Sequence, residues 1–352
     1  MPANHTPIRR LALLVILIAP LLLLTGAYTG LSAPLLATAA AAHPNLAAAT
    51  SWTSGWTSIN QDQTRIFNHN LNVPPEQLAV ELWFRDTAAG GLGIHRAHYG
   101  GIEISDPTSI RQGAFWRNLT ANTIAVRRLP DDELTDQINV RVWVAPMPDY
   151  DSGWQAIAPD ATQVFNHNLG IPATDLTVGM WFRSTLLGIH QYAYGGLTDR
   201  TDEQGAYWYG LTDNSVSVYR LPDDIWVEQV RVVVVQGDPP AYDSLVALGS
   251  WQTVAPGATF TFNHNLNWDP NLLVVRAECY GNVSGVPSIH QMWAGGDEWA
   301  GGQFCGAHVQ RLTANTVQFV RQPNDLQCNQ ARVVIYTRAA PQHFCLPLIL
   351  NR

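Results

Sequence analysis

Apolar residues recur at every second position in three segments of the chain, 78–84, 176–182 and 273–279. This period of two is typical of β-strands that bury one face. The core positions that it predicts are Leu78, Val80, Leu82, Phe84, Leu176, Val178, Met180, Phe182, Leu273, Val275, Ala277 and Cys279. Shorter apolar runs, separated by turn residues, follow in each region, and no run has helical periodicity. The pattern therefore predicts an all-β chain.

The segment FNHNL occurs three times, at 67–71, 165–169 and 262–266, and its histidines are 98 and 97 residues apart. This spacing is longer than the unit of about 20–50 residues in a solenoid, but it suits a small domain. We therefore expect three tandem antiparallel β-sandwich repeats of about 97 residues. Their predicted boundaries are 53–147, 152–238 and 249–338, followed by a C-terminal tail at 339–352.

Two tryptophans, Trp83 and Trp181, lie on the outer face of their alternating strands. Their rings need either a ligand or a neighbouring copy as a partner. We favour a compact intramolecular pseudo-trimer over an extended array, because packing between copies would cover both rings.

Three histidines, His69, His167 and His264, lie inside the FNHNL segments, where a strand ends and a turn begins. Asparagine-rich turns hydrogen-bond their own backbone, and a histidine beside them can cap the carbonyl groups at the strand end. We therefore predict a structural role in the turn for these three side chains.

Residues 1–42 lie outside the repeats. Arg9 and Arg10 precede an apolar run at 11–24, and small residues continue to Ala42. A charged start, an apolar stretch and small residues are typical of a secretory signal peptide, with an uncleaved N-terminal anchor as the alternative. The mature chain is therefore expected to be extracellular or at the cell surface.

The balance of charged residues argues against a nucleic-acid partner. The chain has 28 acidic and 20 basic residues, and all the basic ones are arginine. An acidic balance opposes binding to the phosphate backbone, so we expect no nucleic-acid partner.

All four cysteines, Cys279, Cys305, Cys328 and Cys345, lie in the last third of the chain. An even number of cysteines in an exported chain predicts one or two disulfides. Our preferred pair is Cys305–Cys328, which would flank one hairpin, but spacing alone leaves three full pairings open.

The opening Trp56, the Phe67-x-His69 turn, the strand at 78–84 and the closing segment 141–145 together resemble the H-type lectin domain. The turn also resembles HNLG turns of phage tail-fibre receptor-binding modules. The lectin resemblance implies a six-stranded antiparallel sandwich that assembles as a trimer and binds sugars such as N-acetylgalactosamine between protomers. The end of the chain resembles the short LPL-type tails of some secreted bacterial proteins, or is an ordinary last strand.

The strand that follows the first alternating one combines aromatic rings with polar groups, the mixture that holds a sugar. The predicted ligand-binding residues are His95, Tyr99, Trp83, Arg85, His190, Tyr192, Tyr194, Trp181, Arg183 and His290. In the third copy, Met292, Ala294 and Glu278 replace the aromatic positions, so we expect that site to be altered or lost.

Catalysis and metal binding have weaker support. The repeated carboxylate pairs, Asp131-Asp132 and Asp223-Asp224, follow Leu-Pro and are best explained as turn formers. Each copy has two candidate histidines, whereas a closed zinc site needs four ligands. We therefore expect no enzyme activity, no metal and no cofactor.

The sequence thus predicts an exported, multivalent carbohydrate-binding protein of bacterial type, whose partners are glycans or surface polysaccharide. The alternative is a non-enzymatic structural or filament-forming surface protein that self-associates through exposed tryptophan faces. His95, His190 and His290 favour binding, because an assembly surface could use any apolar residue at these positions.

Overall fold

The computed structural model describes residues 51–103, 111–198, 203–237, 239–292, 294–295, 297–299 and 303–337. They belong to one unit of the chain, residues 48–352. The predicted signal segment at 1–42 and the tail at 339–352, which includes Cys345, lie outside the described residues. Within the described ranges, no helix is long and apolar enough to cross a membrane.

The strands follow the same order three times, in repeat 1 (51–144), repeat 2 (150–236) and repeat 3 (242–337). Repeat 1 contains β1 (Ser51–Thr53), β2 (Thr57–Ser58), β3 (Thr64–Asn68), the 3₁₀ turn η1 (Pro75–Gln77), β4 (Leu78–Asp86), β5 (Gly93–His95), β6 (Ile102–Glu103), β7 (Arg111–Gln112), β8 (Ala114–Arg117), β9 (Thr123–Arg128) and β10 (Gln137–Val144). Repeat 2 contains β11 (Tyr150–Asp151), β12 (Gln155–Ala156), β13 (Ala161–Asn166), η2 (Ala173–Asp175), β14 (Leu176–Ser184), β15 (Gly188–His190), β16 (Leu197–Thr198), β17 (Glu203–Gln204), β18 (Ala206–Tyr209), β19 (Ser215–Arg220) and β20 (Gln229–Gln236).

Repeat 3 adds a short helix, α1, after its first strand. Its elements are β21 (Tyr242–Asp243), α1 (Ser244–Leu248), β22 (Gln252–Thr253), β23 (Thr259–Asn263), η3 (Pro270–Leu272), β24 (Leu273–Val283), β25 (Val286–His290), β26 (Asp297–Trp299), β27 (Gln303–Cys305), β28 (Ala307–Gln310), β29 (Thr316–Arg321) and β30 (Gln330–Thr337). The three alternating segments of the sequence thus form β4, β14 and β24, as predicted.

Each repeat forms a five-stranded, a three-stranded and a two-stranded antiparallel sheet. In repeat 1 the large sheet has the order β1-β10-β4-β5, with β2 also on β10, and the small sheet has the order β3-β9-β8. The strands β6 and β7 pair with each other. The same orders recur in repeats 2 and 3, so a residue in one copy can be matched to its counterparts by register.

The all-β prediction is confirmed, but the prediction of three tandem β-sandwich repeats is wrong. The larger sheets, two from each repeat, are arranged as the six blades of a β-propeller. The burial of β4 gives the physical reason. Leu82 and Phe84 pack against the small sheet of their own repeat, whereas Trp83 on the opposite face packs into the core of repeat 3. A large sheet that is covered on both faces is one blade of a ring and not one half of a separate sandwich.

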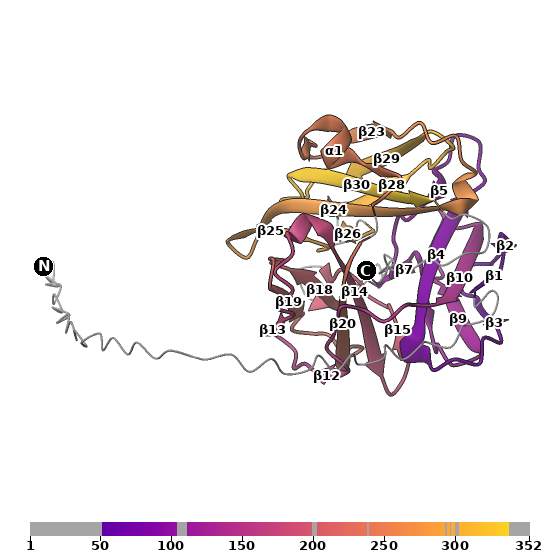
Figure 1. The fold of residues 1–352 in the computed structure, drawn as a ribbon. Coiled ribbons are helices and arrows are strands. Elements are labelled where there is room, and N and C mark those ends of the chain that lie inside the picture. The colour runs from indigo at the N-terminus through magenta and orange to yellow at the C-terminus, as the bar shows by residue number, and fades with distance from the viewer. Residues whose placement is uncertain are drawn as a thin grey trace, which may run out of the picture. The chain divides into compact units, whose positions relative to one another are not determined.

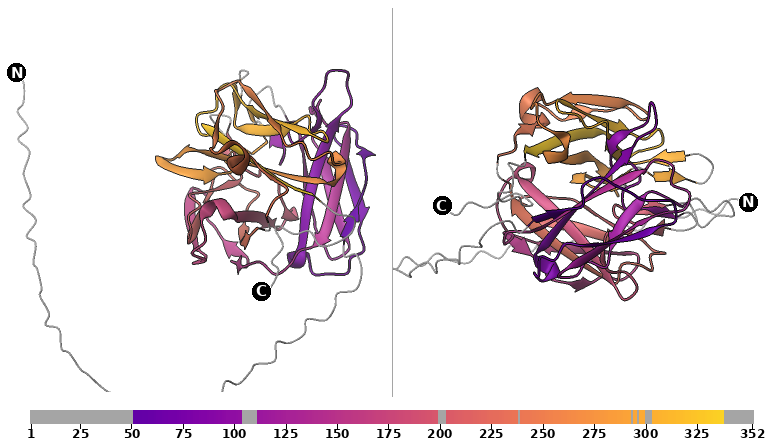
Figure 2. Two further views of the ribbon diagram at one scale, coloured as in Figure 1. Left: turned by 45° about the horizontal axis from the view of Figure 1, so that its top comes forward. Right: turned by 90° about the vertical axis from the view of Figure 1, so that its right-hand side faces the viewer.

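The three repeats surround one centre. In Figure 1, repeat 1 lies to the right, repeat 2 below and repeat 3 at the top, and the turned views in Figure 2 keep the repeats side by side. The edge strand of each large sheet meets the edge of a neighbour's small sheet. Backbone hydrogen bonds across the three interfaces run from Gln191 N to Trp116 O (3.1 Å), from Gln291 N to Trp208 O (3.1 Å) and from Arg96 N to Val309 O (2.9 Å). Because edge strands otherwise expose unpaired backbone groups, this pairing closes the ring and protects those edges.

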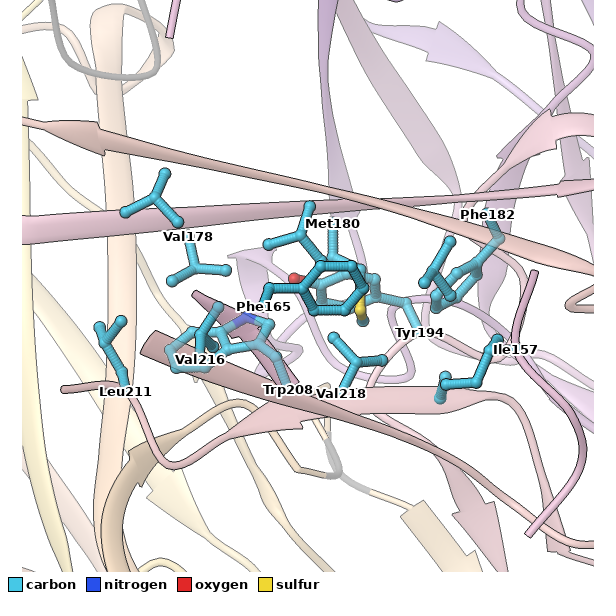
Figure 3. Close-up of a cluster of buried hydrophobic side chains, with 14 of the residues drawn as sticks. Ile157, Phe165, Val178, Met180, Phe182, Tyr194, Trp208, Leu211, Val216 and Val218 are labelled. Carbon is cyan, nitrogen blue, oxygen red and sulfur yellow. The ribbon is translucent and has the colours of Figure 1, made fainter. Parts of the chain in front are cut away.

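Figure 3 shows the core between the two main sheets of repeat 2. Alternate residues of β14 supply one side, and residues of β18 and β19 supply the other. These residues are Val178, Met180, Phe182, Trp208, Val216 and Val218. None of them is more than 6% exposed. Burial of each such side chain stabilises the fold by about 1.5–3 kcal/mol, which makes this core a main source of stability.

A buried ion pair recurs in every repeat, at Arg128–Asp132, Arg220–Asp224 and Arg321–Asp325. The Nε–Oδ2 distances are 2.8, 2.7 and 2.7 Å. In repeat 1 the guanidinium also donates to the carbonyl oxygen of Ile59 (2.8 Å), and the carboxylate accepts the backbone N–H of Gly113 (3.0 Å). Since both charges are buried and satisfied, these aspartates hold the turn that follows β9 and its counterparts.

The disulfide predicted for repeat 3 is present, but the preferred pairing is wrong. Cys328 bonds to Cys279, with their Cα atoms 4.9 Å apart, and not to Cys305. The Sγ of Cys305 is buried and lies 3.7 Å from the carbonyl oxygen of Asn324. Cys279 lies opposite Ala331 in β30, at the register where repeats 1 and 2 place a phenylalanine opposite isoleucine or valine. The disulfide therefore fills core space that larger side chains fill elsewhere.

The structure of the three FNHNL turns shows why each contains a histidine and a second asparagine. Asn70, Asn168 and Asn265 have φ of 53°, 54° and 53°, a left-handed conformation that asparagine tolerates. His69, His167 and His264 are buried, and the Nδ1 of each accepts the backbone N–H of the leucine two residues later at 3.4 Å.

Candidate functional site

A pocket of about 210 Å³ lies where the three repeats meet. The central strands β4, β14 and β24 build its walls, together with the residues that follow β5, β15 and β25. Its aromatic lining consists of Tyr99, Trp143, Trp181, Tyr194, Phe319 and Tyr336. Its polar lining includes Glu81, Arg96, Thr177, Gln191, Arg276 and Gln291. The pocket thus combines aromatic surface with a few convergent polar groups.

The three central strands place different side chains at one register position of the pocket wall. The three residues are Glu81 of β4, Gly179 of β14 and Arg276 of β24. Each lies opposite the equivalent residue of the last strand of its repeat, which is β10, β20 or β30. A larger residue at Gly179 would be crowded, since a Cβ there would lie 3.0 Å from the Trp181 ring and 3.0 Å from Val233. The ring of Trp181 therefore forms the wall on the side of repeat 2.

At two of the three interfaces, a glutamine joins a tryptophan and a tyrosine of the preceding repeat. The Oε1 of Gln191 accepts Trp116 Nε1 (2.9 Å) and the hydroxyl of Tyr99. Its Nε2 donates to Met180 O at 2.8 Å. Burial raises the pKa of Tyr99 to about 12, so this hydroxyl stays protonated and donates.

The interface between repeats 2 and 3 has the same arrangement. The Oε1 of Gln291 accepts Trp208 Nε1 (3.0 Å) and the hydroxyl of Tyr194. Burial raises the pKa of Tyr194 as well.

The third interface, between repeats 3 and 1, lacks this cluster. Val309 stands at the tryptophan position of β28, Ala294 stands at the tyrosine position, and Arg96 replaces the glutamine. All three residues line the pocket. Two large rings are thus replaced by small side chains, which leaves room in the pocket, and a guanidinium takes the place of an amide.

Arg96 holds a positive charge at the pocket. Its Nη2 lies 2.9 Å from Glu81 Oε1, and its guanidinium carbon lies 4.3 Å from the ring centroid of Trp83. The Arg96 side chain is 27% exposed, whereas that of Glu81 is 4% exposed. Arg141 approaches the other carboxylate oxygen at 3.0 Å. Because one carboxylate lies between two guanidinium groups, this group of three side chains has a net charge of +1.

In repeat 3, Arg276 of β24 belongs to a neutral network that borders the pocket. It pairs with Glu278, which also contacts Arg332 at 3.1 Å, and Arg332 pairs with Asp243 at 2.6 Å. Arg276 also donates to Thr177 Oγ1 and to Leu176 O of repeat 2. This arginine therefore joins two repeats at the edge of the pocket.

The three histidines predicted to bind a ligand are buried instead. His95, His190 and His290 have no exposed surface. Each Nε2 faces a carbonyl oxygen, of Leu134 (2.9 Å), Trp226 (3.0 Å) or Gln327 (3.2 Å). Each Nδ1 accepts a backbone N–H at 3.1–3.2 Å. Both ring nitrogens are used within the fold, and burial lowers the pKa of all three to about 4.

The predicted tryptophan and arginine faces are also arranged differently from expectation. Trp83 is 1% and Trp181 7% exposed, because each packs into a neighbouring repeat. Neither ring is therefore the broad exposed face that the sequence predicted, and Trp181 borders the central pocket. Arg85 and Arg183 stack on Trp56 and Trp154 with guanidinium-to-centroid distances of 4.0 and 4.1 Å.

Tyr192 is also buried, 4.5 Å from the ring of Phe115 and 5.3 Å from that of Trp226. Of the ten predicted ligand residues, four border the central pocket: Tyr99, Trp181, Tyr194 and His290, the last with no exposed surface of its own. The pocket residues that the prediction omitted include Glu81, Arg96, Arg276 and Val309. The signal that identifies them is the difference between copies, since the GIHR segment of repeat 1 stands against GIHQ and SIHQ in the other two.

Within the described residues, no group of three or more His, Cys, Asp or Glu side chains is arranged to hold a metal ion. The pocket therefore offers hydrogen bonding, aromatic stacking and charge as its means of recognition. The chain matches no protein-family model, no curated protein sequence and no solved structure in the comparisons made.

Proposed function

We propose that this protein is a non-enzymatic carbohydrate-binding protein that holds one small saccharide unit in the central pocket. The observation that carries the proposal is the joint replacement of a tryptophan, a tyrosine and a glutamine by Val309, Ala294 and Arg96 at one interface. Packing alone would favour the cluster that closes the other two interfaces. We place the site in this pocket, which all three repeats build, and not in one site per repeat.

The chemistry and the size of the pocket support a sugar. Trp181, Trp143 and Tyr336 line the pocket and supply apolar ring surface for the C–H groups of a sugar, and Arg96 and Thr177 supply polar groups for its hydroxyls. The volume of about 210 Å³ lies below the range of about 300–1,000 Å³ that drug-sized ligands occupy. It therefore suits one ring better than an extended oligosaccharide.

We further propose that the protein acts outside the cell or at its surface, where such ligands are found. The charged and apolar pattern of residues 1–42 supports export. The Cys279–Cys328 disulfide supports an oxidising destination.

The test is a glycan array probed with the mature protein and with the triple variant Arg96→Gln, Ala294→Tyr and Val309→Trp. This variant copies into the third interface the residues that the other two already use, so we expect it to fold. The wild type should bind a defined set of saccharides, and the variant should lose them. A matched control, Tyr280→Ala, removes an exposed tyrosine outside the pocket and should bind as the wild type does.

Absence of binding by the wild type to every saccharide on the array would refute the proposal. Equal binding by the folded triple variant would also refute it, because the pocket would then have no role.

A further inference from the structure

We infer that the saccharide in this pocket carries a carboxylate, as a uronic acid does, and that Arg96 binds it. The inference rests on the proposed function and specifies its ligand class. It is carried by the charges around the pocket and by the hydrogen-bonding state of one guanidinium group.

The charge balance favours an anion. Arg96 and Arg141 share the single carboxylate of Glu81, at 2.9 and 3.0 Å. The other contacts of Arg141 are to uncharged carbonyl oxygens of Asn271 and Leu273. Arg276 of repeat 3 is already neutralised in a network with Glu278, Arg332 and Asp243. One positive charge thus stays unbalanced among the described side chains around the pocket, and a ligand carboxylate would neutralise it.

The surroundings of Arg96 strengthen that attraction. Its guanidinium lies over the Trp83 ring and 5.5 Å from the centroid of Tyr99, so part of its hydration is removed. A charge in such an environment interacts more strongly than one in bulk water. A planar guanidinium also matches the two oxygens of a carboxylate.

One donor of Arg96 has no acceptor. The Nε is buried and has no hydrogen-bond partner among the described residues. A buried donor that lacks a partner is costly, and native structures normally satisfy such groups. The guanidinium thus has donor capacity that Glu81 does not use, and a ligand oxygen can approach the part of this side chain that is exposed.

The chain contains its own comparison for this position. Gln191 and Gln291 occupy the place of Arg96 at the other two interfaces, where each is satisfied by a tryptophan and a tyrosine. A neutral amide therefore suffices where the interface only has to pack. The arginine occurs at the one interface that lacks the tryptophan and the tyrosine.

The experiment measures affinity by titration calorimetry for two matched ligand pairs, galacturonate with galactose and glucuronate with glucose. Each pair differs only in the group at C6. At least one uronate should bind more tightly than its neutral partner, by roughly 10- to 100-fold, which is the usual effect of a charge-assisted hydrogen bond. The Arg96→Gln variant should lose that preference, and Arg96→Lys should retain part of it.

Three results would overturn the inference, and each has a separate consequence for the proposed function. If neutral sugars bind as well as uronates, the pocket binds saccharides without selecting the carboxylate. If uronate affinity is unchanged in Arg96→Gln, another group binds the acid. If sodium acetate displaces the uronate at equal concentration, the site takes any small anion and the sugar proposal falls with it. A circular dichroism spectrum equal to that of the wild type confirms that each variant is folded.

Discussion

Mild acid should unfold this protein, because three histidines at equivalent positions must be neutral in the fold. In repeat 1 the Nδ1 of His95 accepts the backbone N–H of Ala97, so it carries no proton, and the neutral ring donates from Nε2 to Leu134 O. His190 and His290 repeat this arrangement. Protonation of Nδ1 would break a hydrogen bond and place a charge in a site that excludes water.

The size of the effect follows from the pKa values. Burial lowers the pKa of each of these histidines from 6.5 to about 4. Between these pH values the unfolded chain binds more protons than the folded one, so the free energy of unfolding falls as the pH drops from 6.5 towards 4. From pH 7 to pH 5 the loss is roughly 2 kcal/mol per histidine and roughly 6 kcal/mol for the three. Since domains have a total stability of about 5–15 kcal/mol, this loss is large enough to unfold the protein.

Urea unfolding followed by tryptophan fluorescence at pH 7, 6 and 5 measures this loss directly. His190→Gln keeps a donor for the carbonyl of Trp226 but cannot be protonated, so its stability should fall by about 2 kcal/mol less than that of the wild type over the same range. An NMR titration should place the three imidazole pKa values well below 6. Stability that does not change between pH 7 and 5, or pKa values near 6.5, would refute the reasoning.

Three further predictions concern stability. Burial, followed by the nearby His98, lowers the pKa of His308 to about 4. Phenylalanine stands at this position in repeat 1, and His308→Phe should raise the free energy of unfolding at pH 5 by about 1–2 kcal/mol relative to its effect at pH 7. An equal effect at both pH values contradicts this. The Cys279–Cys328 disulfide closes a loop of 49 residues, and its reduction should lower the free energy of unfolding by about 4 kcal/mol. Urea titrations with and without reductant measure this difference, and coincident curves would show that the loop entropy does not matter. Asp224→Ala leaves the buried charge of Arg220 without its carboxylate and should cost about 3–5 kcal/mol in the same assay, whereas a cost below 1 kcal/mol would show that water reaches the guanidinium.

The strands could be predicted from the sequence because alternation reports burial directly. The three alternating segments became β4, β14 and β24, with Leu78, Leu176 and Leu273 at their starts. The arrangement of sheets could not be predicted in the same way. Alternation shows that one face of a strand is buried, but it does not show which sheet covers that face or what covers the other. The outward ring of Trp83 was compatible with a ligand platform and with packing against a neighbour, and the ring of blades decides for packing.

The candidate site could be predicted only in part. A polar residue in a strand, such as His95, indicates a functional role as long as its hydrogen-bond partners are unknown. Here both ring nitrogens bond to backbone groups of the same repeat, so the role is structural. The pocket depends on differences between copies and not on what they share. Arg96 is far in sequence from Ala294 and Val309, and only the closure of the ring brings it to them.

Joining three copies in one chain has a consequence that a trimer of separate subunits could not have. Identical subunits must place the same side chain three times around their axis, so the electrostatic field at the centre is threefold symmetric. Here the same register position carries a carboxylate at Glu81, no side chain at Gly179 and a guanidinium at Arg276. Duplication within one gene thus frees each position around the axis to change alone. The centre of the molecule can then distinguish the two ends of a ligand that has no symmetry of its own.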